Sequence, residues 1–258
     1  MAPDNAARLV SQALTQYQSL SLILIAIAFA TLEPLLPHHP VDRRREAILD
    51  VVGVVAGLVF VAISYGSLGW LARLANVAAF GEAMRMVRAL SPALKVLFVI
   101  LMVDFNIYWL HRAMHRWNFP WRMHRWHHSI EEMYWFAGFR ASFLHVLLYG
   151  IPQVILPVMV FDLSVGETAF ATGVANFVQI WTHTNLKVNI GPLRSIIVTP
   201  DYHRVHHRAS NGPAKNLSNV LTVWDRLFGT YEAPDRNPVS HFGLVEPRPS
   251  LPRMLLGV

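Results

Sequence analysis

The sequence predicts an all-α protein: a multi-pass transmembrane helical bundle of four to five spans, with a cytoplasmic helical cap that carries a cluster of histidines. Composition is the first reason, because 53% of the 258 residues are hydrophobic and 15% are charged, whereas a soluble domain carries about 25% charged residues. Five long apolar stretches are the second reason. The third is that eight of the thirteen histidines fall in three short words, HRAMH, HRWHH and HRVHH.

The apolar stretches define the predicted spans, since a helix that crosses a bilayer needs about 20 mainly apolar residues. They are Tyr17–Leu32, Val51–Gly69, Pro92–Leu110, Ala141–Phe161 and Thr168–Thr182. We expect the last two to form a hairpin, and Pro152 and Pro157 to bend the fourth, which a buried bundle tolerates. The alternative for the first is a signal peptide cut after Ala28-Phe29-Ala30, but the apolar run continues past that cut.

The orientation follows from Arg43–Arg45, which come directly after the first span and predict that this loop is cytoplasmic. Counting spans from there brings the histidine words to the cytoplasmic side. The segment 71–91 would then be external although it holds several arginines, and we expect it to be an amphipathic helix lying on the membrane surface. A preference for arginine over lysine favours a bacterial plasma membrane.

The chain divides into N-terminal membrane anchor helices (1–91), a domain that carries the histidine words (92–232) and a loose C-terminal tail (233–258). The absence of cysteine excludes disulfides, iron–sulfur clusters, thiolate-bound haem and a cysteine nucleophile. No GxGxxG motif opens a βαβ unit, so no bound flavin or nicotinamide is expected. The net charge of +6 fits anionic lipid headgroups as partners better than nucleic acid.

Histidines three and four positions apart share a helix face, so each word is expected to aim its rings at a common point. A further histidine ends the fifth span. One tetrahedral zinc needs four ligands, so nine histidines predict two metal ions with four or five ligands each. The candidate ligands are His111, His115, His124, His127, His128, His183, His203, His206 and His207.

The other histidines and the nearby acids have simpler interpretations. We expect His38, His39 and His241 to be interfacial residues and His145 to be a packed or hydrogen-bonded ring. Metal-bound histidine usually donates its second N–H to a nearby group. The candidate acceptors are Asp104, two helical turns before His111, and Asp201, two residues before His203. Five tryptophans fit an interfacial aromatic belt: Trp109, Trp117, Trp121, Trp126 and Trp135.

The histidine words occur together with further motifs, and the set resembles the fatty acid hydroxylase/sterol desaturase superfamily of integral-membrane di-iron enzymes over roughly Leu97 to Tyr231. The HRxxH and first HxxHH motifs are followed by a His-Thr-Asn element, a P-x-x-HxxHH element and an ending of the form N-x-x-x-x-L-x-x-W-D-x-x-F-G-T-Y. These motifs lie at His111–His115, His124–His128, His183–Asn185, Pro200–His207 and Asn216–Tyr231.

The resemblance implies two Fe ions, for which zinc can substitute, with O2 as co-substrate and electrons from a separate electron-transfer protein or reductase. A lipid from the bilayer would be hydroxylated or desaturated at an unactivated C–H position. The motifs add Asn185 and Asn216 to the side chains expected beside the ligands. Two departures from the family pattern stand out. Leu217-Ser218 follows that asparagine in place of Tyr-Gly, which leaves its local geometry open, and Arg140-Ala141-Ser142 in place of Arg-x-His-Pro is closer to an alkylglycerol monooxygenase-like branch than to sterol-acting members.

Two other functions compete with this interpretation. A membrane metal transporter should hold its ligands near the bilayer midplane on broken helices, whereas the predicted ligands gather at one boundary. A zinc-dependent lipid hydrolase needs three protein ligands and one open position, fewer than the nine histidines offer.

Overall fold

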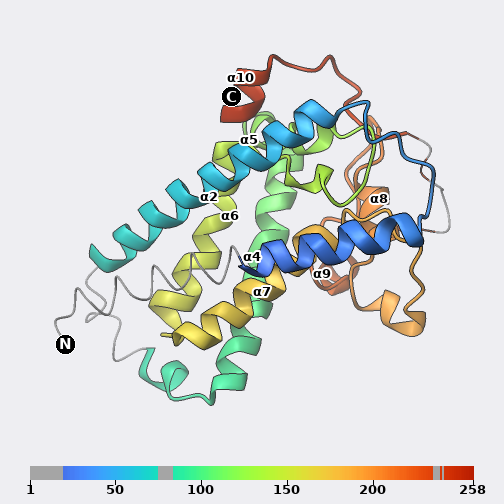
Figure 1. Ribbon diagram of the computed structural model, residues 1–258. Coiled ribbons are helices and arrows are strands. Elements are labelled where there is room, and N and C mark those ends of the chain that lie inside the picture. Colours follow the sequence, from blue (N-terminus) through green and yellow to red (C-terminus); the bar gives the residue numbers. More distant parts are fainter. Residues whose placement is uncertain (1–19, 75–83, 235–238, 240) are drawn as a thin grey trace.

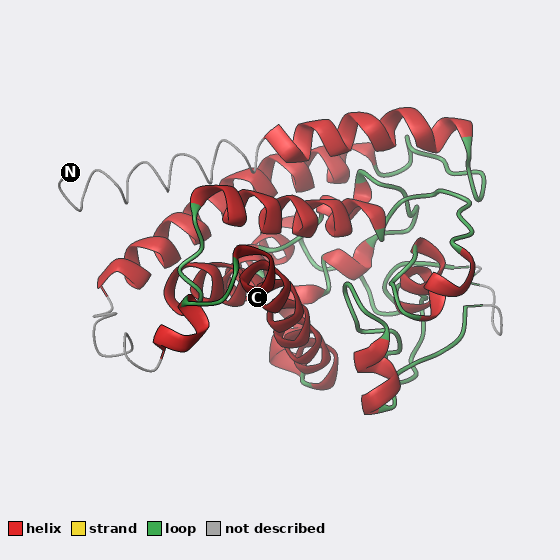
Figure 2. Ribbon diagram, turned by 90° about the horizontal axis from the view of Figure 1, so that it is seen from below, coloured by secondary structure: helices red, strands yellow, loops and turns green. Residues whose placement is uncertain are grey.

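The computed structural model describes residues 20–74, 84–234, 239 and 241–258. Within these residues every regular element is a helix, and loops are joined by isolated β-bridges. Figure 2 shows long helices bundled together, with many loops and short helices gathered at one side of them. The long helices are α2 (Ala47–Leu74), α4 (Pro92–Arg116), α6 (Phe143–Ile155), which continues as a π-helical turn (Leu156–Val160), and α7 (Val165–Trp181) (Figure 1).

Three helices of the described chain are long and apolar enough to cross a membrane: Ala47–Leu71, Pro92–Arg116 and Phe143–Val160. The helix Leu20–Leu35 and α7, of 17 residues, are apolar but shorter, and a bilayer core needs about 20 residues. By length, three of the described helices can span a membrane, and the expected four to five spans are not confirmed. The start of the first predicted span, residues 17–19, lies outside the described residues.

The helix boundaries follow from local sequence. Ser91 precedes α4 and Pro92 occupies its first turn, where the missing N–H costs nothing. α7 begins with a capping box in which Ser164 and Glu167 satisfy each other's backbone N–H groups. Pro157 lies in the π-helical turn that ends α6, so the expected irregularity of this span is an extra-wide turn, a common way for a helix to absorb disruption.

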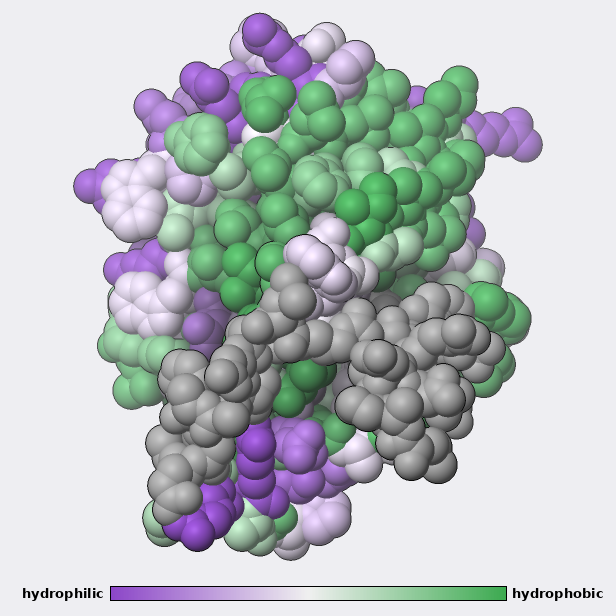
Figure 3. Space-filling model, turned by 90° about the vertical axis from the view of Figure 1, so that its left-hand side faces the viewer, coloured by the Kyte–Doolittle hydropathy of each residue, from purple (hydrophilic) through white to green (hydrophobic). Residues whose placement is uncertain are grey.

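The outer face of the bundle is apolar. Figure 3 shows a hydrophobic region across the middle of the molecule and hydrophilic side chains gathered along its upper edge. On α2, Val51, Val55, Leu58 and Ile63 are each half or more exposed. An exposed apolar surface of this kind marks contact with lipid, which agrees with an integral membrane protein.

The helix Leu20–Leu35 is packed into the core although it is short. Phe29 is buried together with Ile180 at the end of α7 and Leu186 beyond it. Because Phe29 belongs to the signal-peptide alternative, that alternative would remove part of this core. The segment 36–39 continues by pairing with 185–187, where the His38 N–H donates to the Asn185 carbonyl at 2.8 Å.

The segment expected to be a loose tail is attached to the bundle in its described part. α10 (Leu251–Leu256) packs on α5 (Asn118–His124) and α6, and Met254 is buried. Arg248 pairs with Glu46 and donates to the Ser129 carbonyl at 3.0 Å. Ion pairs and a buried side chain, rather than composition, decide the placement of this Pro-rich segment.

The predicted surface helix between the second and third spans falls partly on residues 75–83, which lie outside the described residues. The part that the structure describes is helical at 84–88. There Arg88 donates to the Met159 carbonyl at 2.7 Å, so this end of the segment contacts the π-helical turn of α6.

Candidate metal centre

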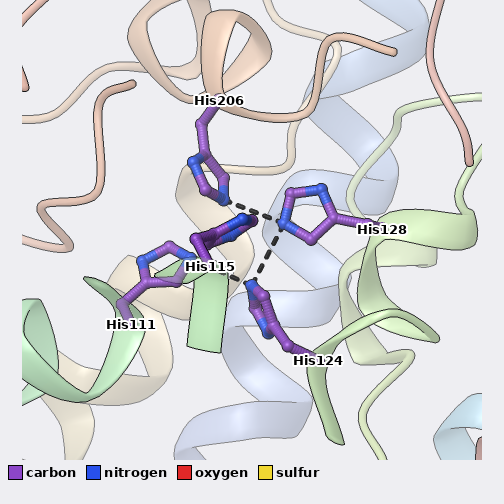
Figure 4. Close-up of side chains that lie close together, drawn as sticks. All are labelled: His111, His115, His124, His128 and His206. Carbon is purple, nitrogen blue, oxygen red and sulfur yellow. Dashed lines mark hydrogen bonds between the residues drawn. The ribbon is translucent and has the colours of Figure 1, made fainter. Parts of the chain in front are cut away.

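The nine histidines lie together at one end of the long helices, in two groups. In each group, every ring offers one nitrogen, and these nitrogens all lie within 4.8 Å of one another. The five-histidine group is His111, His115, His124, His128 and His206, whose rings converge in Figure 4. The four-histidine group is His127, His183, His203 and His207.

The two groups adjoin each other. The His128 ring of one stacks on the His207 ring of the other, with centroids 4.5 Å apart. Eight of the nine side chains are buried and His115 is partly exposed. The protein therefore presents two neighbouring clusters of imidazoles shielded from water.

Each HxxHH word contributes to both groups, contrary to the expectation that a word aims its rings at one point. His124 and His128 join the five-histidine group, whereas His127 faces the four-histidine group. The second word is divided the opposite way, with His206 in the first group and His203 and His207 in the second. Residues four apart on a helix stay aligned, but adjacent residues point about 100° apart, so the paired histidines diverge toward neighbouring centres.

Different elements carry these words. α4 supplies His111 and His115 one turn apart, and α5 ends at His124. His127 and His128 follow in a 3₁₀ turn, His127–Ser129. α8 (Pro200–His206) begins after Thr199, whose side chain accepts the Tyr202 N–H, and Pro200 favours its first turn. The remaining ligand candidate, His183, comes just after α7.

Backbone carbonyls orient four of the rings. His111 Nδ1 donates to the Leu217 carbonyl at 2.7 Å and His206 Nδ1 donates to the Lys215 carbonyl at 2.9 Å. In the four-histidine group, His127 Nδ1 donates to the Arg140 carbonyl at 3.1 Å. His183 Nδ1 donates to the Gln179 carbonyl at 2.9 Å. A neutral imidazole with its proton on Nδ1 carries a lone pair on Nε2, so these bonds turn the lone pairs inward.

The inward-facing nitrogens fit a bound metal ion. Nε2 of His127 and Nε2 of His183 are 3.1 Å apart, and both are acceptors because their protons lie on Nδ1. Two facing lone pairs repel each other unless a cation lies beside them. Nitrogens about 2.1 Å from one ion and at right angles to each other would be about 3.0 Å apart, which agrees with the spacing.

Burial keeps these imidazoles in the neutral form that binds metal. It lowers the pKa of His127, His203 and His207 well below the usual value and lowers the pKa of His183 to about 4. The same cause acts on His128 in the other group. Proton competition for the ligand nitrogens is therefore weak at neutral pH.

The carbonyl that orients His111 lies in a loop held by Asp225. This fully buried carboxylate accepts from the Leu217 and Ser218 N–H groups at 2.8 and 2.7 Å, and from the Tyr202 hydroxyl at 2.5 Å. The backbone N–H groups of Leu217 and Ser218 thus share one carboxylate. Asp225 stabilises the position of the Leu217 carbonyl without touching a histidine itself.

Asp104 supports the same loop rather than accepting from His111 as expected. Its carboxylate accepts from the N–H groups of Val220 and Leu221 at 2.8 and 3.0 Å and from Trp224 Nε1 at 2.8 Å. Two helical turns place Asp104 on the face of α4 that carries His111, but about 10 Å farther along the axis. Its partner in the membrane is therefore the loop that follows the second HxxHH word.

The other polar side chains expected beside the ligands also hold the scaffold. Asn185 accepts from Arg204 at 2.9 Å and donates to the His39 carbonyl at 2.7 Å. Asp201 pairs with His38 at 3.4 Å. Asn216, in the left-handed conformation at φ 56°, donates to the Tyr202 carbonyl at 3.1 Å.

The histidines not expected to be ligands lie outside both groups. His38 and His39 contact each other near the surface, and His241 is exposed. His145 is a hydrogen-bonded ring, as expected, and its Nδ1 is 3.2 Å from Nδ1 of His124. Of the predicted aromatic belt, Trp109 and Trp117 are exposed, whereas Trp126 is fully buried in the cap.

Sequence reasoning missed a buried acidic network from the N-terminal segment. Arg140, whose carbonyl orients His127, donates from Nε to Asp50 at 2.6 Å and pairs with Glu46 at 3.0 Å. Glu33, which is fully buried, accepts from the N–H groups of Trp135 and Asn185 at 3.0 and 2.9 Å. These acids lie in the segment predicted to be a membrane anchor. The identity of an acidic residue near a helix end does not indicate which distant residue it contacts.

One glycine is required for close approach to the centre. A Cβ on Gly138 would lie 2.6 Å from Cγ of His183, far inside van der Waals contact. The glycine therefore allows the loop that carries the Arg140 carbonyl to pack directly on a ligand ring.

Comparison with known proteins gives a consistent result. The fatty acid hydroxylase family model matches residues 96–230. Alkylglycerol monooxygenase of Homo sapiens is 36% identical over 150 residues, which are 56% of this chain and 32% of that protein. Ornithine lipid hydroxylase OlsE of Rhizobium tropici is 28% identical over 153 residues, 59% of this chain and 46% of that protein.

A third relative is the Delta(7)-sterol 5(6)-desaturase of Eremothecium gossypii, 34% identical over 148 residues, which are 55% of this chain and 39% of that protein. The chain thus spans between a third and a half of the length of these relatives. No solved structure matches it.

Proposed function

Because the chain belongs to the fatty acid hydroxylase family, we propose that it is a membrane-bound, O2-dependent di-iron oxidoreductase that hydroxylates or desaturates an unactivated C–H position of a lipid. The observation that carries the proposal is the division of nine buried histidines into adjoining groups of five and four. A tetrahedral zinc is saturated by four ligands, whereas iron accepts imidazole in sites with more. The five-histidine group therefore favours iron.

In this proposal the five-histidine group holds one iron and the four-histidine group the other. When bound, the irons would supply the activation of O2 that attack on an unreactive C–H bond requires. The chain's own groups orient the ligands: the Leu217, Lys215, Arg140 and Gln179 carbonyls accept from Nδ1 and direct Nε2 inward. Burial excludes water from the rings and keeps them unprotonated.

We place this centre on the cytoplasmic side of a bacterial plasma membrane. Arg43–Arg45 directly precede α2, and Arg45 pairs with Glu131 at 2.8 Å, beside the histidine words. Arginines flanking a span favour the cytoplasm, so the centre and the arginines share one side. α7 begins at the outer end, where Lys95 pairs with Glu167 at 3.1 Å, and runs back toward His183. We propose α7 and the helix Leu20–Leu35 as the further membrane helices.

The substrate class we propose is a lipid that carries a long alkyl or acyl chain. Three relatives named for lipids, an alkylglycerol monooxygenase, an ornithine lipid hydroxylase and a sterol desaturase, each match more than half of the chain. A site at the end of the spans lets an apolar chain enter from the bilayer while electrons arrive from a separate protein in water.

The test uses purified protein in detergent and cells that carry or lack the gene. We expect about two irons per chain and, in lipid extracts analysed by mass spectrometry, a lipid that gains one oxygen or loses two hydrogens only when O2 is present. Alanine at His124 or His206 should abolish the product, whereas alanine at the exposed His241 should not. Iron-free protein that retains activity, or product formed without O2, would overturn the proposal.

A further inference from the structure

Trp121 lies between the five-histidine group and the surface of the protein. Its ring centroid is 5.2 Å from that of His115, 5.3 Å from that of His128 and 6.4 Å from that of His124. The side chain is partly exposed, and its Nε1 donates to the exposed Glu246 at 3.0 Å. One indole thus contacts three of the five rings in this group and also reaches solvent.

Other aromatic rings near the histidines do not make this connection in the described part of the chain. Tyr149 is 4.3 Å from His145 and 6.4 Å from His111, but it lies on α6 inside the bundle. Trp126 is fully buried. The four-histidine group is backed by buried groups such as Arg140. The route from surface to histidines through a conjugated ring therefore passes Trp121.

The surface around Trp121 is basic. The stretch 111–126 contains four arginines and no acid. Arg116 and Arg122 are exposed, and neither pairs with an acid among the described residues. Arg125 follows Trp121 by one turn, and the exposed Arg253 lies on α10, which packs on α5. We define the basic face as Arg116, Arg122, Arg125 and Arg253.

The arginines at the other edge of the cap are neutralised by contrast. Arg43 pairs with Glu33 at 2.8 Å and Arg45 pairs with Glu131 at 2.8 Å. Arg125 of the basic face donates to the Val258 carbonyl at 3.1 Å, whereas Arg116 and Arg122 have no acidic partner among the described residues. A positive patch raises the rate of encounter with an acidic protein and orients it. The basic face is therefore suited to an acidic partner, directly above the ring that touches the centre.

We propose that Trp121 is the electron-entry residue of the centre and that the basic face binds a small acidic one-electron carrier protein. The inference rests on the proposed function, since hydroxylation and desaturation with O2 both consume two electrons from a donor. At each encounter the carrier loses one electron and one ferric ion gains it. The indole is unchanged, and two encounters balance one turnover.

The first experiment measures docking without any activity. The probe is an oxidised plant-type [2Fe–2S] ferredoxin, and the protein is metal-free and held in detergent at low salt. The double variant Arg116→Gln/Arg122→Gln should bind the ferredoxin about tenfold more weakly, the size expected for two exposed ion pairs. Arg44→Gln, at the edge where arginines are neutralised, is the matched control and should bind normally.

The second experiment compares two reductants of the iron-loaded protein by stopped-flow absorbance. With reduced ferredoxin, Trp121→Leu should slow reduction of the iron by roughly tenfold, and Trp121→Phe should restore much of the rate because a ring is retained. Dithionite is small and needs no docking surface, so its rate should stay within twofold of wild type. Trp117→Leu, an exposed tryptophan on the same segment, is the control and should match wild type with both reductants.

Several results would overturn the inference. One is an equal loss of rate with ferredoxin and dithionite, which would mean that Trp121 is needed only for packing. Another is unchanged ferredoxin affinity in the arginine double variant together with weaker binding to phosphatidylglycerol vesicles, which would identify a lipid-binding surface. If the wild-type protein holds no reducible iron, the proposed function itself fails. If iron is reduced and product forms, but Trp121→Leu behaves as wild type, the electron-entry inference alone fails.

Discussion

Neutralising Asp50 tests whether the N-terminal segment supports the metal centre. In Asp50→Asn the buried Arg140 guanidinium loses a carboxylate bonded at 2.6 Å, and the Tyr134 hydroxyl loses a charged acceptor at 2.6 Å. Breaking a buried ion pair on one side costs about 3–5 kcal/mol. Glu46 stays within 3.0 Å of the same guanidinium, so we expect a loss of folding free energy at the low end of this range, about 3 kcal/mol.

The effect should reach the four-histidine group through the Arg140 carbonyl, which orients His127. Loss of such an outer partner typically weakens metal binding about 10–100-fold, so the variant should retain about one iron per chain at limiting iron. Metal content is measured by plasma mass spectrometry and stability by denaturant unfolding in detergent. Glu131→Gln is the control, because its side chain is 36% exposed and surface pairs contribute about 0–1 kcal/mol.

A double-variant cycle sharpens this test. Arg140→Gln alone leaves Asp50 buried without its cation, and combining it with Asp50→Asn removes both charges. The double variant should be less destabilised than the sum of the two single variants, because coupled buried charges are not additive. Additive effects, or an Asp50→Asn protein with two irons and wild-type stability, would refute the reasoning.

Three further outcomes are expected. Gly138→Ala should displace His183 and lower the iron content, with a loss of stability of about 1–3 kcal/mol from overpacking. Gly173→Ala is the control and should keep two irons, because nothing lies within 4 Å of its added Cβ. Equal iron content in the two variants would contradict the close contact at Gly138. In metal-free protein, His183 has its pKa lowered to about 4 from about 6.5 in the unfolded chain, so the unfolded state binds more protons between these values. Stability should therefore fall as pH is lowered from about 6.5 to about 4, and a melting temperature that is flat or rises over this range would be inconsistent with neutral buried rings. His203→Ala should lower iron content by about half, as one of two ions loses a ligand, while His241→Ala should not, and iron analysis of the pair distinguishes a ligand from a surface ring.

The sequence predicted that the nine histidines gather, because their signal is local. Spacings of three and four residues are read directly from words such as His124–His128, and the number of histidines led to the hypothesis of two ions. The division of each word between two groups was not predicted, because it depends on how α5 and α8 lie against each other. Backbone carbonyls such as that of Leu217 were also missed, since any residue can supply one and side-chain identity carries no signal.

Three of the predicted membrane helices are confirmed as apolar helices of spanning length, and the remaining spans stay a prediction. Apolar length identified α2, α4 and α6, since hydropathy alone decides such segments. α7 is apolar yet has 17 residues, and its assignment depends on packing rather than composition. The tail was judged from its prolines, while the contacts that hold it, such as Arg248 with Glu46, join residues some two hundred positions apart and are invisible to local patterns.

The buried acids of the described residues support the scaffold and lie outside both candidate metal groups. In the described chain, both candidate metal groups contain histidine alone. Asp225 and Asp104 hold the loop behind His111, and Asp50 holds the arginine behind His127. In the proposed centre, a neutral ligand set around two cations would need rigid positioning, because no carboxylate could compensate for a displaced ring. The family match begins at residue 96, yet Asp50 holds the side chain of Arg140, whose carbonyl orients His127, so we expect the N-terminal segment to support the proposed centre.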